Sequence, residues 1–249
     1  MADELRKTMP AGGPSVLDRA VDRSLQTRTR NAELLAAALA TIAGFIDAYG
    51  FITYGVYVSF MSGNTTQTGY LAGQGAFAAA ALSALAILFF VGGSFAGTLL
   101  TQCAGRQGRG VVFGAVAAAL TAVVVFWRLG FVDAGAHIPT ISFAMGIMNC
   151  ALSHVGAQPV SLAFVTGSLS RVGSSLALAL TRAPLRDARG PWDTQLRRAL
   201  LLARVWIGFL AGAMLSGAAT PRYGAWVLLA PALILAVLAA FDRPERDAV

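Results

Sequence analysis

Charged residues are scarce in this chain of 249 residues. They make up 12% of the sequence, whereas 56% of the residues are hydrophobic and the mean hydropathy is +0.65. Soluble domains carry about 25% charged residues, so this composition excludes an ordinary soluble domain and predicts a membrane protein. The 27 glycines fit closely packed transmembrane helices, in which small residues let two backbones approach each other.

Signatures of metal, disulfide and nucleotide chemistry are also missing. With only two cysteines and two histidines, the sequence predicts neither a disulfide framework nor a zinc site. It contains no nucleotide-binding glycine loop and no pair of metal-binding histidines. The net charge of +7 comes without a nucleic-acid-binding motif, and a positively charged cytoplasmic face explains it better. We therefore expect no cofactor, no metal and no nucleic-acid partner.

Six apolar stretches are long enough to cross a bilayer, which takes about 20 residues of helix. They are Glu33–Tyr54, Phe77–Thr101, Val111–Leu129, Ile138–Val155, Ala199–Ala219 and Ala225–Phe241. The sequence thus predicts an all-α membrane protein with six transmembrane helices, forming a single domain over residues 32–241.

The distribution of basic residues orients these helices. Fifteen of the 19 Lys and Arg residues fall in segments on one side of the predicted membrane, and only Arg128 and Arg222 fall on the other. Positive residues mark the cytoplasmic side, so both termini are expected there, in a bacterial inner membrane. Residues 1–31 lack the pattern of a signal peptide and are predicted to be a mobile cytoplasmic tail with a short helix near Ser15–Ser24. Residues 242–249 would form the cytoplasmic C-terminus.

The two halves of the chain resemble each other. "GFIDAYGFITYGVYVSFMSGNTTQTG" (Gly44–Gly69) aligns with "GIMNCALSHVGAQPVSLAFVTGSLSRVG" (Gly146–Gly173) after a two-residue insertion. The repeats extend over residues 32–130 and 138–241. Each contributes three crossings, an odd number, so the second would enter the membrane from the opposite face. Pseudo-symmetric 3+3 inverted repeats of this kind are typical of secondary transporters.

Each repeat also contains a polar, glycine-bearing break, in Val56–Gly73 and Val160–Thr181. These segments are predicted to be broken or re-entrant helices, because polar backbone at membrane depth must be buried in protein or line a cavity. The second is apolar enough to be a seventh crossing instead, although the arginine count argues against that. Ser62 and Thr166 are residue types found at helix N-caps, and helix N-termini attract anions.

We expect the two breaks to face each other near the bilayer midplane and to form one site for a small polar or anionic solute. The candidate substrate-binding residues are Asp47, Ser59, Ser62, Gly63, Asn64, Thr65, Gln67, Asn149, Ser161, Thr166, Gly167, Ser168 and Arg171.

Asp47 is the only acidic residue deep within an apolar run. A carboxylate at the bilayer centre costs about 2.5 kcal/mol or more, so it must be paired, solvated or protonated. It is interpreted either as a proton, cation or ligand site or as a structural group that caps the broken segment. Asn149 is its neutral counterpart and is expected to hydrogen-bond to the facing break. Arg171 would either pair with Asp47, bind an anion, or extend to the cytoplasmic interface.

The motifs "GFIDAYGF…FMSGNTTQTG" and "GIMNCA…FVTGSLSRVG" are similar to those of the YoaK-type family, a domain-of-unknown-function group of bacterial multi-pass inner-membrane proteins. The resemblance covers the chain after the tail and implies a multi-helix membrane fold without implying a substrate. Ser62 stands where the family commonly has Thr, and Ser168 where it commonly has Asn.

Taken together, these patterns favour a secondary transporter or channel-like carrier over an enzyme. One alternative is a membrane scaffold or regulator without a solute, whose basic segments contact anionic lipid. Another is an intramembrane hydrolase that uses Ser62 and His154, the other histidine, His137, being expected outside the membrane. The expected partners are the lipid bilayer and a small solute, and association into a homodimer is left open.

Overall fold

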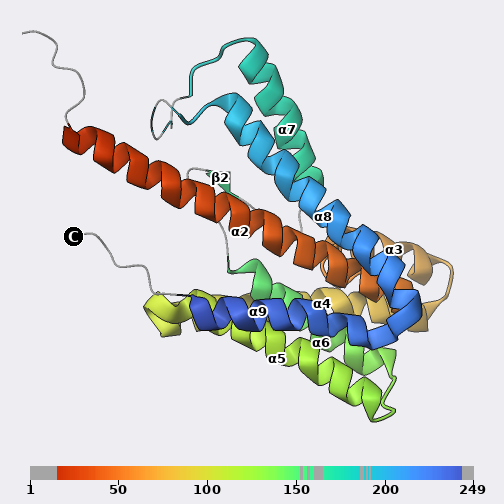
Figure 1. Cartoon of the computed structure of the whole chain (residues 1–249). Helices are drawn as coiled ribbons and strands as arrows, with labels where there is room; N and C mark the ends of the chain where they lie inside the picture. Colours follow the sequence, from red (N-terminus) through yellow and green to blue (C-terminus); the bar gives the residue numbers. More distant parts are fainter. Residues whose placement is uncertain are drawn as a thin grey trace, which may run out of the picture.

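A computed structural model describes residues 16–151, 154–155, 158–159, 165–185, 188, 190 and 192–242 (Figure 1). The helices are α2 (Val16–Tyr54), α3 (Met61–Gly73), α4 (Phe77–Ala104), α5 (Gly108–Arg128), α6 (Ala134–Asn149), α7 (Val165–Leu180), α8 (Gln195–Tyr223) and α9 (Leu229–Phe241). Short 3-10 helices, η1 (Gly105–Gln107) and η2 (Gly224–Leu228), precede α5 and α9. β1 (His154–Val155) and β2 (Gln158–Pro159) form a two-residue antiparallel ladder. The predicted helical fold class is confirmed.

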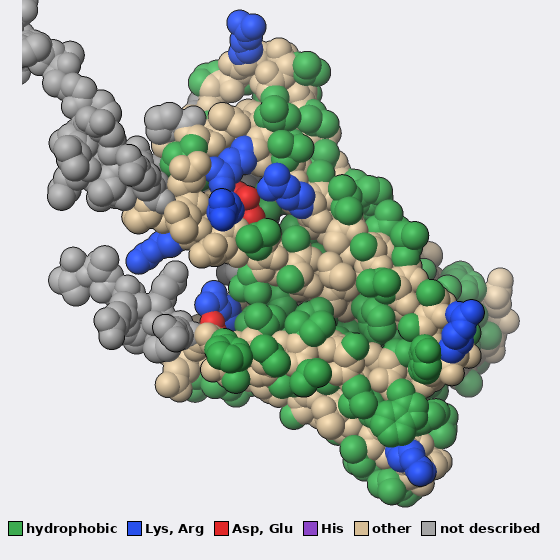
Figure 2. Space-filling view, in the orientation of Figure 1, with side chains coloured by type: hydrophobic (Ala, Val, Ile, Leu, Met, Phe, Trp, Pro, Cys, Tyr) green, Lys and Arg blue, Asp and Glu red, His purple; other side chains and the backbone are tan. Residues whose placement is uncertain are grey.

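Among the described residues, four segments are long and apolar enough to cross a membrane. They are residues 24–54, 77–104, 108–128 and 195–241. The last of these contains α8, η2 and α9, and the chain reverses between α8 and α9 at Gly224, where φ is +54° (Figure 1). Hydrophobic side chains cover much of the visible surface (Figure 2), as expected for helices that face lipid.

Helix α2 extends further toward the N-terminus than predicted. It is continuous over 39 residues, so the helix expected near Ser15–Ser24 is its first part and residue 31 is not a break. The sequence has no Pro or Gly between Pro14 and Gly44, and its arginines are good helix formers, so nothing interrupts the helix. Residues 1–15 lie outside the described part of the chain.

The fourth predicted span differs most from the structure. Helix α6 begins four residues earlier than Ile138 and ends at Asn149, while His154 and Val155 lie in β1. The Asp133 carbonyl starts the helix by accepting hydrogen bonds from the amides of Ala136 (3.2 Å) and His137 (3.0 Å). At 16 residues, α6 is about 24 Å long.

The closing span is made of two kinds of helix. The five residues of η2 lead directly into the 13 residues of α9. With rises of about 2.0 and 1.5 Å per residue, their combined length is about 30 Å, which matches the hydrocarbon thickness of a bilayer.

Helices α2 and α8 cross at very short range. Gly44 of α2 faces the backbone carbonyl of Phe209, and Gly212 of α8 faces the backbone carbonyl of Thr41. A Cβ atom at either glycine would lie 2.8 Å from the carbonyl carbon opposite it, so no larger residue fits without moving a helix.

Helices α4 and α6 cross in the same manner. Gly93 of α4 faces the carbonyl of Phe143, and Gly146 of α6 faces the carbonyl of Phe90. A Cβ atom would lie 2.8 Å from the Phe143 carbonyl carbon in one case and 2.8 Å from the Ser94 amide nitrogen in the other. These glycines therefore allow close helix packing, as expected for small residues in membrane proteins.

The remaining helices pack in pairs around these two crossings. Helix α5 packs against α9, α3 against α4, and α7 against α8. Helix α2 begins and α9 ends at the same end of the bundle, on the left in Figure 1. The largest fully buried side chains are Tyr49, Phe113, Leu39, Ile46, Leu120, Ile138, Ile141, Met145, Met148, Leu202, Leu228 and Leu235.

Candidate functional site

A pocket of about 510 Å³ lies where the chain leaves α2 and enters α3. It is formed by the last turn of α2, the connecting loop (residues 55–60) and the first turns of α3. Its lining residues are Phe51, Gly55, Tyr57, Phe60, Ser62, Gly63, Thr66, Gln67 and Tyr70. The first polar break, singled out in the sequence, therefore lines a pocket in the structure.

Asp47 holds the loop that forms one wall of this pocket. Its Oδ1 atom accepts hydrogen bonds from the backbone amides of Val58 (2.9 Å), Ser59 (2.7 Å) and Phe60 (3.3 Å). The side chain is buried, with the residue 4% exposed. Bonds from N–H groups to a carboxylate are charge-assisted and stronger than neutral ones. These contacts agree with the interpretation of Asp47 as a structural group that caps the broken segment.

Side chains of α3 hold the same loop from the other side. The fully buried Asn64 accepts from the Tyr57 amide (3.1 Å) through Oδ1 and donates to the Tyr57 carbonyl (2.6 Å) through Nδ2. Gln67 donates to the carbonyl of Gly55 (2.8 Å), a residue whose φ of +71° favours glycine. Asn64 and Gln67, predicted to bind substrate, thus bind backbone, and Gln67 lines the pocket as well.

Aromatic rings form the apolar part of the pocket wall. The rings of Phe51 and Tyr57 stack with centroids 4.6 Å apart, and Tyr57 meets Phe60 edge to face at 5.2 Å. Gly63 makes room for this arrangement, because a Cβ atom there would lie 2.7 Å from Cε1 of Phe60. The glycine of this break therefore serves ring packing beside the pocket.

The first turns of α3 supply the polar part of the pocket. Ser62 and Thr66 lie one turn apart, and the Thr66 hydroxyl donates to the Ser62 carbonyl (3.2 Å). Helix N-termini carry a partial positive charge and exposed amides that favour anions. A small solute with an apolar body and a carboxylate or carbonyl end would match these walls.

Both polar breaks begin a helix, as predicted, although the caps differ from the prediction. Helix α3 has Phe60 as its N-cap and no side-chain cap, so Ser62 is the second residue of the helix and not its cap. Asp47 explains the difference, because it reaches across from α2 and takes the amides that precede the helix. Helix α7 begins at Val165, one residue before Thr166.

The remaining predicted site residues lie in several places. Ser59 is buried in the loop beside Asp47, and Thr65 is exposed on α3, outside the pocket lining given above. Asn149 is the last residue of α6. On α7, Thr166 and Arg171 are exposed, Gly167 is partly buried and Ser168 is buried. Ser161 lies outside the described residues.

The described lining of the pocket at the first break comes from the first half of the chain. Among the described residues, the lining lies between Phe51 and Tyr70, while α3 packs on α4 and α7 packs on α8 (Figure 1). A midplane pocket shared by both breaks therefore stays a prediction. The described site lies near the end of α2, with Asp47 about 10 Å before the last residue of that helix.

One contact that sequence reasoning missed joins the two repeats at this end. The Tyr54 hydroxyl, at the end of α2, lies 2.6 Å from Nδ1 of His137 in the first turn of α6. His137 is buried in the protein, with 2% exposure, and its expected place outside the membrane stays a prediction. The early start of α6 at Ala134 is the reason, because it places the ring inside the bundle. Only a more accurate helix boundary could have indicated this from the sequence.

In the part of the chain that the structure describes, no group of three His, Cys, Asp or Glu side chains is placed to hold a metal ion.

Comparison with known proteins agrees with a membrane protein. The UPF0700 transmembrane protein RA0705 of Rhizobium meliloti (strain 1021) is 31% identical over 216 residues, which are 85% of this chain and 87% of that protein. No solved structure matches the chain. A family model described as "Protein of unknown function (DUF1275)" matches residues 35–241, so the YoaK-type resemblance is confirmed and the chain belongs to the DUF1275 family.

Proposed function

We propose that the chain is a secondary transporter or channel-like carrier for a small polar or anionic solute, and not an enzyme. The observation that carries the proposal is the pocket beside α3, a polar helix too short to cross a bilayer. With 13 residues α3 is about 20 Å long, whereas the hydrocarbon core is about 30 Å thick. A short polar helix at membrane depth is tolerated where it lines a cavity, which is the use transporters make of it.

The pattern of helix contacts supports an inverted repeat of α2–α5 and α6–α9. Helix α2 packs on α8 and α6 packs on α4, so the first long helix of each repeat crosses the second long helix of the other. Gly44 and Gly146, which the sequence alignment pairs, occupy equivalent positions in the two crossings. Helices α5 and α9, which would be equivalent in this repeat, pack together, as expected for a twofold axis between them.

Six crossings and two cytoplasmic termini follow from this repeat. The crossings would be α2, α4, α5, α6, α8 and the combined η2 and α9. An even number returns the chain to its starting side, in keeping with the common end at which α2 begins and α9 ends (Figure 1). The sequence predicts that the segments with 15 of the 19 basic residues lie on that side, so we assign it to the cytoplasm of a bacterial cell.

The solute would bind against the first turns of α3. Ser62 and Thr66 would receive its polar or anionic end near the helix N-terminus, and the rings of Phe51, Tyr57 and Phe60 would cover its apolar part. Asp47 acts indirectly in this proposal, by fixing the loop that carries two of these rings. Association of two copies stays a prediction.

A screen of small organic acids, amides and inorganic anions tests the proposal. Uptake into proteoliposomes would identify the solute, and the same compound should raise the melting temperature of the purified protein. Thr66→Ala should weaken binding about threefold to tenfold by removing a polar contact in the pocket.

Thr65→Ala is the matched control for this variant. Both threonines are exposed on α3 and donate to the carbonyl four residues before them, at 2.8 Å for Thr65 and 3.2 Å for Thr66, but only Thr66 lines the pocket. Equal loss of binding in both variants, or uptake unchanged in Thr66→Ala, would count against the site.

The hydrolase alternative has a separate test. Ser62 is exposed at the pocket, whereas the side chain of His154 lies outside the described part of the structure. A serine-reactive fluorophosphonate probe labels an activated serine nucleophile and should leave Ser62 unlabelled in a carrier. Labelling of the protein that Ser62→Ala abolishes would replace the carrier proposal with an enzyme.

A further inference from the structure

A second, basic cleft lies between α2 and α8 at the end of the bundle where α8 begins. Its volume is about 500 Å³, and its lining includes three arginines (Arg30, Arg197 and Arg204), one acid (Glu33) and one large apolar residue (Leu200). Among the described lining residues, three cations exceed the single anion by two charges, so the cleft is suited to a ligand with negative charge.

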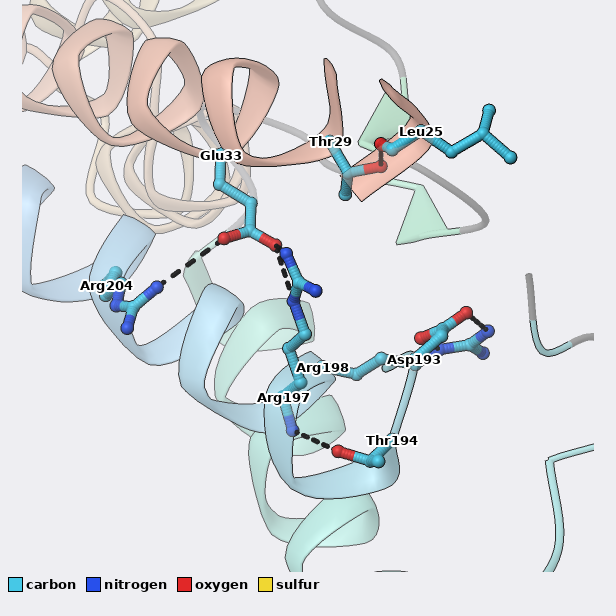
Figure 3. A network of polar contacts seen from close by, with 8 residues as sticks. All are labelled: Leu25, Thr29, Glu33, Asp193, Thr194, Arg197, Arg198 and Arg204. Carbon is cyan, nitrogen blue, oxygen red and sulfur yellow. Dashed lines mark hydrogen bonds and ion pairs between the residues drawn. The ribbon is translucent and has the colours of Figure 1, made fainter. Parts of the chain in front are cut away.

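Glu33 organises two of the three arginines. Its Oε1 atom accepts from Nε (3.1 Å) and Nη2 (2.9 Å) of Arg197, and its Oε2 atom lies 3.5 Å from Nη1 of Arg204 (Figure 3). The Glu33 side chain is only 7% exposed, while that of Arg204 is 61% exposed. One buried carboxylate therefore holds two guanidinium groups at the cleft.

Neighbouring contacts fix Arg197 further, and a second acid, Asp193, pairs with Arg198. The Arg197 guanidinium lies 4.6 Å from the centre of the Trp192 ring, and its backbone amide donates to the hydroxyl of Thr194, the N-cap of α8. Asp193 forms two hydrogen bonds with Arg198, at 2.9 and 2.8 Å (Figure 3). Asp193 is not part of the cleft lining, so it leaves the excess positive charge there in place.

The cleft stands at the boundary between polar and apolar surface. Leu34 follows Glu33 on α2 and is exposed, as is Leu200 on α8. Basic and acidic side chains gather in one place beside a broad hydrophobic surface in Figure 2. A membrane interface has the same arrangement, because a polar layer of phosphate groups lies next to an apolar layer of acyl chains.

We propose that this cleft binds the phosphate group of an anionic phospholipid. Guanidinium groups bind phosphate through parallel N–H···O bonds, and basic pockets between helices at the cytoplasmic side are suited to lipid headgroups. Arg30 and Arg204 would contact the phosphate, while Leu200 and Leu34 would face its acyl chains. The proposal depends on the membrane placement of the chain but not on transport.

Lipid binding to the purified full-length protein in detergent tests the proposal. Phosphatidylglycerol should bind in native mass spectrometry and raise the melting temperature, whereas phosphatidylcholine should do neither. The double variant R30Q/R204Q should bind phosphatidylglycerol about 25-fold more weakly, from about fivefold for each arginine. Arg197 is kept because it forms two hydrogen bonds with Glu33. Arg204 also pairs with Glu33, but its side chain is 61% exposed, so without lipid the variant should melt only slightly below the wild type.

The matched control is R128Q/R222Q, which removes the same charge from exposed arginines at the opposite end of α5 and α8. It should retain wild-type affinity for phosphatidylglycerol. Equal weakening in both double variants, or none in R30Q/R204Q, would overturn the cleft as the site. Stabilisation by inorganic phosphate alone, with displacement of the lipid, would identify a soluble phosphate ligand and overturn the lipid.

Discussion

The two helix crossings of this protein are alike, whereas its two polar breaks differ. At each crossing, one glycine from either helix faces the backbone of the other. At the first break, the Asp47 carboxylate collects three backbone amides. The equivalent residue of the second repeat is Asn149, which ends α6 and carries no charge. The aligned positions at the crossings, Gly44 and Gly146, are both glycine, whereas the aligned polar positions, Asp47 and Asn149, differ in charge.

The strongest test of the similarity between the two helix crossings replaces one glycine at each crossing by a larger residue. Gly44→Val and Gly146→Val should each destabilise the protein by about 3 kcal/mol or more, since the new side chain would overlap the backbone of the partner helix. The yield of folded protein in size-exclusion chromatography and its melting temperature measure the effect. A valine tolerated at only one of the two positions would show that the crossings are not equivalent.

Gly69→Ala and Gly173→Ala are the controls, because the repeat alignment pairs them as well. Both glycines lie inside helices, and a Cβ atom at either would meet nothing within 4 Å. Alanine has the higher helix propensity, so each substitution should stabilise the protein by up to about 1 kcal/mol.

The difference between the breaks is tested by removing the polar group from each. Asp47→Ala should lower the free energy of unfolding by about 3 kcal/mol, because it leaves backbone amides buried without an acceptor. Asn149→Ala should lower it by about 1 kcal/mol. Unfolding by sodium dodecyl sulfate in bicelles measures both. Asp47→Asn should fall between the wild type and Asp47→Ala. Equal losses of unfolding free energy at both positions would mean that the two breaks depend on their polar groups to the same extent.

Two ion pairs extend the comparison to the other end of the bundle. Glu33→Gln should cost about 1–2 kcal/mol, since it breaks a largely buried pair that ties α2 to α8. Asp242→Asn breaks the pair with Arg109 that ties α5 to α9, and about 0.5 kcal/mol is expected because that arginine side chain is 40% exposed. High salt should reduce the second effect more than the first. The reverse order of costs would contradict the difference in burial.

A further expected effect concerns the contact between Tyr54 and His137. Tyr54→Phe removes the hydroxyl that lies 2.6 Å from His137 and should lower the unfolding free energy by about 1 kcal/mol. Tyr223→Phe, at a residue 62% exposed, should change it by less than about 0.5 kcal/mol. If the two variants melt alike, the tyrosine–histidine contact does not hold the repeats together.

Local sequence patterns predicted the helix boundaries well where one apolar run forms the whole helix. Helix α4 begins at Phe77, as predicted, and α5 lies within three residues of its expected start at Val111. Both breaks also begin a helix where their polar residues indicated. These features depend on residues close together in the chain, so composition and spacing suffice to indicate them.

The cap of α3 and the length of α6 could not be predicted in the same way. Asp47 replaces a local cap only because α2 and the loop fold against each other, and a sequence window around Ser62 does not contain that contact. Similarly, α6 ends at Asn149 although apolar residues follow it, because the chain turns into the β1–β2 ladder.

The sequence was enough to predict a helical membrane protein and the positions of the polar breaks, because hydrophobic length and residue type act locally, whereas the two related halves stay a prediction. Only the tertiary structure decided that the first break lines its own pocket, and that Glu33 meets Arg197, 164 residues away. Contacts of that range depend on how the backbones cross. The glycines that permit the crossings show only that close approach is allowed, and not which helix will approach.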